Sequence, residues 1–199
     1  MQATPRLTPE LLIAAYRQGI FPMADENGEI GWYEPVWRAI IPLDERFHVP
    51  RRLARTVRSG VFTVTFDTVF DEVIAACAEP APGRETTWIS AEIIRAYREL
   101  HRLGYAHSVE CWRDGQLAGG LYGVAIGGLF AGESMFHRVR DASKVALVHL
   151  VERLRRGGFV LLDSQFIAGP HLLQFGTFEI SRAEYHRLLR AALTVRAVW

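Results

Sequence analysis

Two polar residues near the end of an apolar run have types and spacing suited to the chemistry of an amine or a hydroxyl. Asp163 and Gln165 stand two positions apart within residues 159–166, a β-branched and apolar stretch that predicts a strand. Because side chains two apart on a strand project from one face, we expect the carboxylate and the amide to lie together. Such a pair can orient an amine by paired hydrogen bonds, and a capped strand end gives the same pattern.

A second group of polar residues lies between a glycine-rich strand and the start of a helix. Residues 131–144 read AGESMFHRVRDASK and contain Glu133, Met135 and Lys144, the only lysine of the chain. Free N–H groups at the start of this helix can bind an anion or a carbonyl oxygen, and Lys144 either adds to this site or is a solvated charge. The chain has no G-x-S-x-G turn or other recognisable nucleophile motif, so covalent catalysis has little support.

Four arginines in a segment without acidic residues form a candidate phosphate-binding face. If the segment is helical, Arg51, Arg55 and Arg58 share one side, with Arg52 beside them. A basic face of this size suits a few phosphates of a nucleic acid, and an ordinary solvated helix is the alternative. The formal net charge of the whole chain is only +1, which argues against a protein coated in positive charge to hold a long nucleic acid.

The helices and strands that must position these groups alternate without a regular pattern along the chain. Caps, spacing and turn residues predict helices at 8–18, 67–78, 90–103, 141–156 and 181–198, and strands at 61–66 and 159–166. Turn dipeptides at 114–115 and 127–128 predict a three-stranded antiparallel meander, whose glycines suit close approach by a ligand or another backbone. Residues 20–50 suit an ordered loop or short edge strands. This order predicts an α+β mixed-sheet fold.

The composition is that of an ordinary globular protein. Of 199 residues, 49% are hydrophobic and 23% are charged, which excludes a disordered tail, a collagen-like chain or a coiled coil. We expect neither a transmembrane helix nor a signal peptide, and therefore a cytoplasmic location, because no apolar run approaches the required length. Cys77 and Cys111 are isolated in the sequence, which predicts buried, reduced thiols and no structural zinc.

Taken together, several segments resemble one protein family. The chain contains LLIAAYRQGIFPM, TTWIS, AYRELHRLGYAHSVECW, GGLYGV, LFAGESMF, ASKVAL and LLDSQ in that order. Their order and spacing resemble the leucyl/phenylalanyl-tRNA-protein transferase family, and G-E-S-M-F followed by A-S-K is the most specific part. The resemblance implies a small N-terminal lobe, placed at residues 1–40, followed by an acetyltransferase-like (GNAT) mixed-sheet domain at 41–199.

The same resemblance implies an aminoacyltransferase of the bacterial N-degron pathway. Such an enzyme moves leucine or phenylalanine, and less readily methionine, from aminoacyl-tRNA to the α-amine of proteins that begin with arginine or lysine, which marks them for degradation. It implies no metal and no coenzyme. The expected partners are aminoacyl-tRNA and the acceptor protein, with no membrane, and we expect a monomer.

Matched motif by motif, the resemblance implies roles for individual residues. Asp163 and Gln165 match the pair to which the family's catalysis is attributed, and Glu133 matches the glutamate of G-E-S-M-F. Tyr16 and Trp88 match residues that line the aminoacyl-adenosine site, and there Met23 replaces the usual tryptophan. The apolar pocket for the transferred side chain would be lined by Leu121, Phe130, Met135, Leu147, Leu150 and Leu162.

The implied reaction asks little of the protein, because an aminoacyl ester is already activated. The attacking α-amine has an ordinary pKa of about 7.7–8.0, so a useful fraction is neutral near pH 7. We expect Gln165, held by Asp163, to align the amine and to help remove its proton, and Glu133 to orient the amine or a basic acceptor side chain. In the alternative scheme, the ribose hydroxyl of the terminal adenosine relays the proton.

Three competing functions remain open from the sequence. A CoA-dependent acyltransferase would need a glycine-rich pyrophosphate loop, and residues 140–144 read RDASK at that place. A non-catalytic aminoacyl-tRNA-binding adaptor could retain the fold without turnover. A family member with altered aminoacyl or acceptor specificity is the third, because Met23 and the segment Trp32-Tyr33-Glu34-Pro35 depart from the family pattern.

Overall fold

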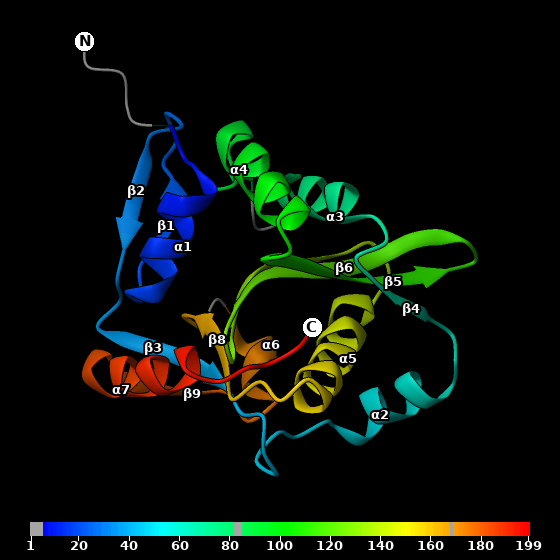
Figure 1. Ribbon diagram of the computed structural model, residues 1–199. Coiled ribbons are helices and arrows are strands. Elements are labelled where there is room, and N and C mark those ends of the chain that lie inside the picture. The colour runs from blue at the N-terminus through cyan, green and yellow to red at the C-terminus, as the bar shows by residue number, and fades with distance from the viewer. Residues whose placement is uncertain (1–5, 82–84, 168) are drawn as a thin grey trace.

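The computed structural model describes residues 6–81, 85–167 and 169–199, and Figure 1 labels its elements. The helices are α1 (Pro9–Arg17), α2 (Arg51–Arg58), α3 (Phe70–Ala78), α4 (Ala91–Arg102), α5 (Ala142–Arg156), α6 (Pro170–Leu173) and α7 (Arg182–Leu193). The strands are β1 (Phe21–Ala24), β2 (Ile30–Tyr33), β3 (Trp37–Ile41), β4 (Thr63–Phe66), β5 (Ala106–Arg113), β6 (Gln116–Ile126), β7 (Leu129–His137), β8 (Leu161–Gln165) and β9 (Phe178–Ser181).

Seven strands form one sheet whose spatial order differs from the order along the chain. The order is β4-β5-β6-β7-β8-β3-β9, and β1 pairs separately with β2. Neighbouring strands of the large sheet are antiparallel except for β7 and β8, which are parallel and are joined through helix α5. The α+β class and the mixed sheet are therefore confirmed, as is the meander of β5, β6 and β7.

Helices cover both faces of the large sheet. On one face α1, α3 and α4 pack around a core that includes Leu12, Ile74 and Tyr97. On the other face α5 packs with α2 around a second core that includes Leu53 and Val151. Figure 1 shows α3 and α4 on one side of β6 and α5 on the opposite side. Each large apolar side chain that is fully buried in these cores contributes about 1.5–3 kcal/mol to stability.

The glycines of the meander admit other parts of the protein. A Cβ atom on Gly119 would lie 2.7 Å from the Cβ of Ala142, so this glycine lets α5 approach β6. A Cβ atom on Gly123 would lie 2.4 Å from the ring of Phe130. The close approach predicted for this strand is therefore made by a helix and by an aromatic side chain.

Strand β3 connects the N-terminal part of the chain to the large sheet. It lies between β8 and β9 and pairs with both. The boundary expected after residue 40 falls inside this strand, so residues 37–40 belong to the same sheet as the part that follows. Residues 6–36, with α1 and the β1–β2 hairpin, lie outside the large sheet, and the division into two domains stays a prediction.

Two predicted helix boundaries and one predicted cap are wrong. Asp141 has a φ of +68° and makes no capping hydrogen bond, because its carboxylate pairs with the side chains of Lys144 and Arg52. Helix α3 begins at Phe70 rather than at 67 or 68. Helix α7 ends at Leu193, because the following residues leave the helix and bring Trp199 against the ring of Phe130.

Both cysteines have the predicted character. Cys77 and Cys111 are buried thiols, and burial raises the pKa of Cys111 to about 12. Within residues 6–81, 85–167 and 169–199, no helix is long and apolar enough to cross a bilayer, and no cluster of three metal-ligating side chains occurs.

Candidate active site

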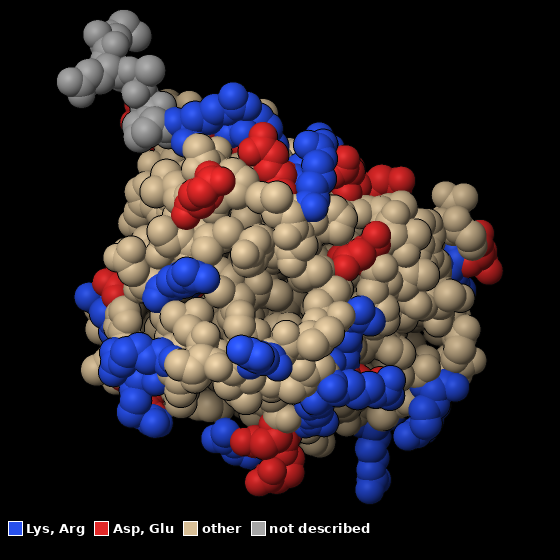
Figure 2. Space-filling model, in the orientation of Figure 1, with Lys and Arg blue, Asp and Glu red and all other residues tan. Residues whose placement is uncertain are grey.

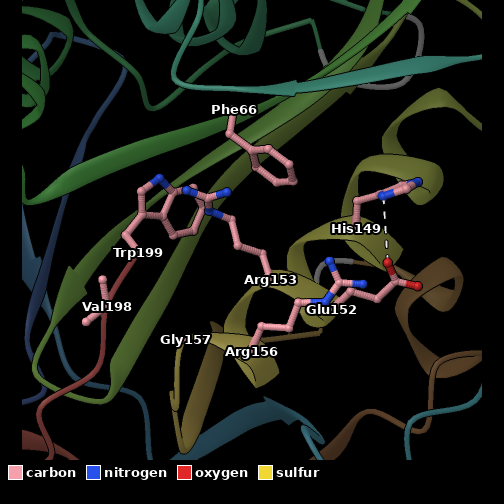
Figure 3. A pocket seen from close by; sticks show the side chains of 8 residues that line it. All are labelled: Phe66, His149, Glu152, Arg153, Arg156, Gly157, Val198 and Trp199. Carbon is pink, nitrogen blue, oxygen red and sulfur yellow. Dashed lines mark ion pairs between the residues drawn. The ribbon is translucent and has the colours of Figure 1, made fainter.

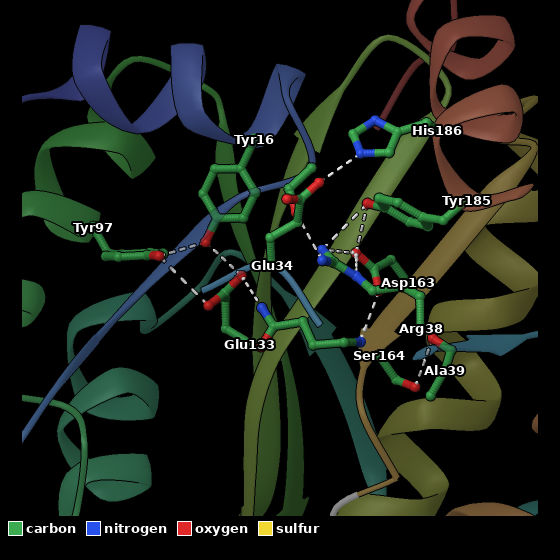
Figure 4. A network of polar contacts seen from close by, with 12 residues as sticks. Tyr16, Glu34, Arg38, Ala39, Tyr97, Glu133, Asp163, Ser164, Tyr185 and His186 are labelled. Atoms are coloured by element: carbon green, nitrogen blue, oxygen red, sulfur yellow. Dashed lines mark hydrogen bonds and ion pairs between the residues drawn. The ribbon is translucent and has the colours of Figure 1, made fainter. Parts of the chain in front are cut away.

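A buried ion pair joins β3 to the end of β8. Asp163 in β8 has no exposed surface, and Arg38 in β3 is 2% exposed. Arg38 donates from Nη2 to Asp163 Oδ2 at 2.6 Å, and from Nε to Oδ1 and Oδ2 at 3.0 and 3.1 Å (Figure 4). A charge left alone at such a depth would be costly, so each of these two groups depends on the other.

Arg38 also reaches the elements on either side of the pair. Its Nη1 donates to the carbonyl oxygen of Gly19 at 2.7 Å, just beyond α1. Its guanidinium carbon lies 4.2 Å from the centroid of the Tyr185 ring, and the Tyr185 hydroxyl donates to Asp163 Oδ2 at 2.8 Å. Burial lowers the pKa of Arg38, but the Asp163 carboxylate outweighs burial and raises that pKa above its ordinary value. The side chain therefore stays charged and connects α1, β3, β8 and α7.

Gln165 ends β8 in a left-handed conformation that Asp163 stabilises. Its φ is +66°, which few residues other than glycine adopt, and its backbone N–H donates to Asp163 Oδ1 at 2.7 Å. The pairing of β8 with β3 omits Ser164, so a β-bulge precedes Gln165. The side chain then reaches β7, where its Nε2 donates to Glu133 Oε1 at 2.9 Å. Asp163 thus holds the backbone of Gln165, and Glu133 holds its amide.

A second β-bulge aims Glu133 at this amide. In the pairing of β6 with β7, Gly123 lies opposite Gly132 and Tyr122 lies opposite Ser134, so Glu133 is the additional residue on β7. Bulges of this kind often redirect a side chain beside an active site. The sequence does not predict this bulge, because the G-E-S run does not interrupt the strand period.

Two tyrosines complete the surroundings of Glu133. The hydroxyl of Tyr16 in α1 donates to Glu133 Oε1, the hydroxyl of Tyr97 in α4 lies 3.4 Å from Oε2, and the two hydroxyls hydrogen-bond to each other. Burial raises the pKa of Glu133 to about 7, with hydrogen bonds from Tyr16 and Gln165 opposing it, although the residue keeps some contact with solvent. Burial also raises the pKa values of both tyrosines, which therefore remain protonated donors.

Glu133 and Gln165 meet where two strands separate. The parallel strands β7 and β8 pair only over Leu129–Ala131 and Leu161–Asp163. Beyond Ala131 and Asp163 the two strands no longer pair, and the hydrogen bond between the Gln165 and Glu133 side chains connects them instead. The Gln165 Nε2 is used by Glu133, whereas its Oε1 accepts no hydrogen bond from any described residue. The arrangement therefore offers a fixed carbonyl acceptor beside a carboxylate that titrates near neutral pH, which suits an incoming amine.

The residues expected at the adenosine site all pack in or against the core that contains α1, α3 and α4. Tyr16 is buried in α1, and Met23 in β1 packs against the same core as Tyr16. Trp88 is partly buried there too, and its carbonyl oxygen accepts a hydrogen bond from the N–H of Ala24 at 3.1 Å. The structure thus brings these three residues to one region, and their contact with an adenosine stays a prediction.

The six apolar residues expected to line the aminoacyl pocket belong to one core. Five of them are buried, Met135 is partly buried, and all six pack in the core between the sheet and α5. They are Leu121, Phe130, Met135, Leu147, Leu150 and Leu162. This packing is compatible with a pocket wall and with an ordinary core, so their role stays a prediction.

The basic residues lie apart from the network. Lys144, in the first turn of α5, donates to Asp141 Oδ1 at 3.1 Å, so its charge is partly neutralised within the protein. Arg51, Arg52, Arg55 and Arg58 are exposed on α2, as a phosphate-binding face requires. Their contact with tRNA stays a prediction.

Sequence reasoning missed Arg38, Tyr185 and Tyr97. The signal for Arg38 was present, because an arginine within the apolar run WRAII needs a buried partner, and Asp163 is the carboxylate in an equally apolar strand. Tyr97 and Tyr185 stand at ordinary core positions of their helices. Nothing in their spacing distinguishes them from core residues, and only the fold shows that their hydroxyls meet Glu133 and Asp163.

Comparisons with known proteins show which family the chain belongs to. The family model for the leucyl/phenylalanyl-tRNA protein transferase matches residues 40–190, and the model for the N-terminal domain of that transferase matches residues 6–36. Among solved structures, L-PGS from Bacillus licheniformis is similar over 94% of this chain and 71% of that chain, with 11% identity and a TM-score of 0.47. That likeness is too weak to support an inference.

Curated relatives match nearly the whole chain. A leucyl/phenylalanyl-tRNA–protein transferase of Herpetosiphon aurantiacus is 61% identical over 98% of this chain and 100% of its own length. The transferase of the same name from Nitrobacter winogradskyi is 59% identical over 98% of this chain and 87% of its own length. The chain therefore belongs to the leucyl/phenylalanyl-tRNA protein transferase family, a family of aminoacyltransferases.

Proposed function

We propose that this protein transfers leucine or phenylalanine, and less readily methionine, from aminoacyl-tRNA to the α-amine of proteins that begin with arginine or lysine, which marks them for degradation. The observation that carries the proposal is the Gln165 amide at the point where β7 and β8 separate, which Asp163 and Glu133 hold while its Oε1 accepts no hydrogen bond from any described residue. Because aminoacyl-tRNA is made and used in the cytoplasm, the protein acts there, as a monomer.

The Gln165 Oε1 accepts an N–H of the incoming amine and so directs the nitrogen lone pair at the ester carbonyl carbon. The C–N bond forms, and the C–O bond to the ribose of the terminal adenosine then breaks. The proton released by the nitrogen passes to the leaving ribose oxygen, through Glu133 or through the neighbouring ribose hydroxyl. Holding both reactants in place supplies on the order of 7 kcal/mol or more of the rate acceleration.

Asp163 acts in this scheme without taking the proton itself. Both of its oxygens already accept hydrogen bonds, from Arg38, Tyr185 and the backbone of Gln165. A carboxylate so enclosed is a positioning residue, and its charge keeps the strained Gln165 backbone in place.

The donor and the acceptor have different binding regions in the proposal. Tyr16, Met23 and Trp88 take the terminal adenosine, the apolar core beside α5 takes the leucyl or phenylalanyl side chain, and α2 takes phosphates of the tRNA. The ionised Glu133 supplies a negative charge close to the attacking amine, which favours acceptors whose first residue is cationic.

A transfer assay over a panel of donors and acceptors tests this function. Leu-, Phe-, Met- and Val-tRNA are each incubated with peptides that differ only in their first residue, Arg, Lys, Ala or Asp. We expect product with Leu, Phe and less with Met, on Arg and Lys peptides only. Another set of productive pairs would show an altered specificity, and tight binding of aminoacyl-tRNA without any product would show an adaptor instead.

The transfer rate should rise with pH through about 7, where Glu133 ionises. Below this pH the carboxyl is neutral and loses its strong attraction for the Gln165 amide and for a cationic acceptor. Arg38, Tyr16 and Tyr97 also face this group, and their pKa values are raised above ordinary values that already lie far above 7, so these three do not give the same rise. In Glu133→Gln the rise near 7 should disappear from the pH profile of kcat/KM, leaving the ionisation of the amine at about 7.7–8.0.

Glu184→Gln is the matched control for that profile, because Glu184 lies half-buried on the surface of α7 and pairs with Arg187. It should keep the wild-type profile. A profile for Glu133→Gln that retains the rise near pH 7 would remove Glu133 from the scheme.

The affinity for tRNA should depend less steeply on salt concentration when a positive charge is removed from α2. Each phosphate contact contributes about one to the slope of log K against log salt concentration, so Arg55→Gln should lower the slope by about one. Arg102→Gln, which removes an exposed arginine from α4, should leave it unchanged. Equal slopes for wild type and Arg55→Gln, measured by filter binding at several salt concentrations, would exclude this residue from the interface.

A further inference from the structure

A pocket of about 340 Å³ lies away from the Asp163 network, between helix α5, strand β4 and the C-terminal residues. Figure 3 shows the eight residues that line it. They are Phe66, His149, Glu152, Arg153, Arg156, Gly157, Val198 and Trp199. Aromatic rings and cationic side chains thus share one concave surface that the proposed transfer does not use.

Arg153 is the central polar group of this pocket. Its guanidinium carbon lies 4.4 Å from the centroid of the Phe66 ring and 4.7 Å from that of Trp199. The two rings stand at 80° to each other, so the guanidinium sits in the corner that they form. The Nε of Arg153 is buried and has no hydrogen-bond partner in the described residues. An unpaired buried donor is costly, and the contacts of the guanidinium with the two ring faces offset part of this cost.

The rings that hold Arg153 are themselves fixed. The Trp199 indole N–H donates to Asp67 Oδ2 at 2.6 Å, and the ring stacks on His107 with centroids 4.4 Å apart and on Phe130 with centroids 5.3 Å apart. Because these contacts restrict Trp199, Arg153 is held near one position before any ligand arrives. Binding then costs less side-chain entropy than at a free surface arginine.

The charges around the pocket favour an anion. Among the described residues, Arg153 and Arg156 form no ion pair with a carboxylate, and Arg156 is exposed. Glu152 is the acidic residue of the lining, and its carboxylate lies 3.8 Å from the Nδ1 of His149. The side chains of the lining therefore include two arginines without a carboxylate partner in the described part of the chain and one glutamate, which already contacts His149.

We propose that this pocket binds a phosphate group, with Arg153 and Arg156 as its ligands. The planar guanidinium donates two parallel hydrogen bonds to phosphate oxygens, and the pocket is large enough for a phosphate with part of its ester. The phosphate belongs to an RNA backbone or is free inorganic phosphate. In the first case the inference rests on the proposed function, because the RNA is then the tRNA donor.

The position of the pocket suits an RNA that also contacts α2. Helix α2 packs against α5, the helix that carries Arg153 and Arg156. On the face shown in Figure 2, Lys and Arg side chains gather at the lower right, where Figure 1 has α2 and α5. The arginines of α2 and the pocket both adjoin α5, so they can hold phosphates of one RNA on both sides of this helix.

Calorimetric titration with inorganic phosphate tests the site directly. We expect wild type to bind phosphate, and Arg156→Met and Arg153→Met/Arg156→Met to bind it at least tenfold more weakly. Arg156 is exposed, so its single variant reports on the site even if the double variant is unstable. Arg190→Met, which removes an exposed arginine from α7, is the matched control and should bind phosphate like wild type.

Filter binding of tRNA to the same variants distinguishes the two sources. A salt slope lowered by about one in Arg156→Met, together with weaker phosphate binding, supports an RNA phosphate. Weaker phosphate binding with an unchanged slope supports free phosphate. Unchanged phosphate binding in both variants, or none in wild type, overturns the proposal. Aminoacyl transfer by wild type is measured separately, so phosphate binding without any transfer would refute the proposed function and leave this site standing.

Discussion

Arg38→Met is expected to lower the free energy of unfolding by about 3–5 kcal/mol, because it leaves the Asp163 carboxylate charged and without its partner in the interior. The Arg38 guanidinium carbon lies 4.8 Å from the centroid of the Phe21 ring and 4.2 Å from that of Tyr185. Methionine keeps most of the apolar contact with these rings, so the loss reports chiefly on the charge. Urea denaturation at pH 7 measures the change in midpoint and slope.

The chain contains a matched control for this variant. Arg46 and Asp44 form the same type of forked contact, and Arg46 also lies over an aromatic ring, Phe178, but this pair is exposed. Arg46→Met should leave the midpoint nearly unchanged. Equal effects of Arg38→Met and Arg46→Met would contradict the importance assigned to burial.

A double variant separates the stabilising role of this pair from its positioning role. Arg38→Met/Asp163→Leu removes both charges, so most of the lost stability should return. Transfer should nevertheless stay far below wild type, because nothing then accepts the backbone N–H of Gln165. Recovery of transfer together with stability would show that the pair serves the fold alone.

Gln165→Gly is expected to lower kcat by about 100-fold or more, with little effect on the KM for the acceptor peptide. In the proposed function the amide oxygen of Gln165 aligns the amine as it attacks, and loss of a group that acts mainly in the transition state lowers kcat and kcat/KM together. Glycine is the suitable replacement because the φ of this residue is +66°, a conformation in which alanine would be strained.

Gln165→Asn provides the companion to that variant. Asparagine also tolerates left-handed backbone and retains the amide, but it is one methylene shorter and does not reach Glu133 in the same way. We expect a large loss of kcat in this variant too, with native stability in urea. Steady-state assays of both variants against an Arg peptide measure kcat and KM separately, and a raised KM at an unchanged kcat would assign Gln165 to binding alone.

The sequence predicts those parts of the fold that have a regular period or a local signal. The meander of β5 to β7 follows from its alternation and from the Asp114-Gly115 and Gly127-Gly128 turns. Helix α4 follows from its Ser90 cap, whose side chain accepts a hydrogen bond from the N–H of Ile93. The same reasoning fails at Asp141, because its carboxylate pairs with Lys144 and Arg52 instead of capping α5.

The candidate site is less predictable, because it depends on contacts between distant segments. Asp163, Gln165 and Glu133 were identified from motifs, but two β-bulges and one left-handed residue decide how they meet, and none of these changes the sequence period. Arg38 lies 125 positions from Asp163, so its role appears only when β3 is placed beside β8. In the proposed function Asp163 is a positioning residue, because both of its oxygens already accept hydrogen bonds.

A single-turnover measurement tests the central claim most directly. Excess enzyme is mixed with leucyl-tRNA that carries labelled leucine, together with a saturating peptide that begins with arginine, and labelled peptide is followed over time. The wild-type protein should label the free peptide and not the same peptide with an acetylated N-terminus. Gln165→Gly should label the free peptide more slowly by about 100-fold or more. Gln18→Ala, on the exposed end of α1, should match wild type. Equal rates for wild type and Gln165→Gly, or equal labelling of the acetylated peptide, would contradict the account.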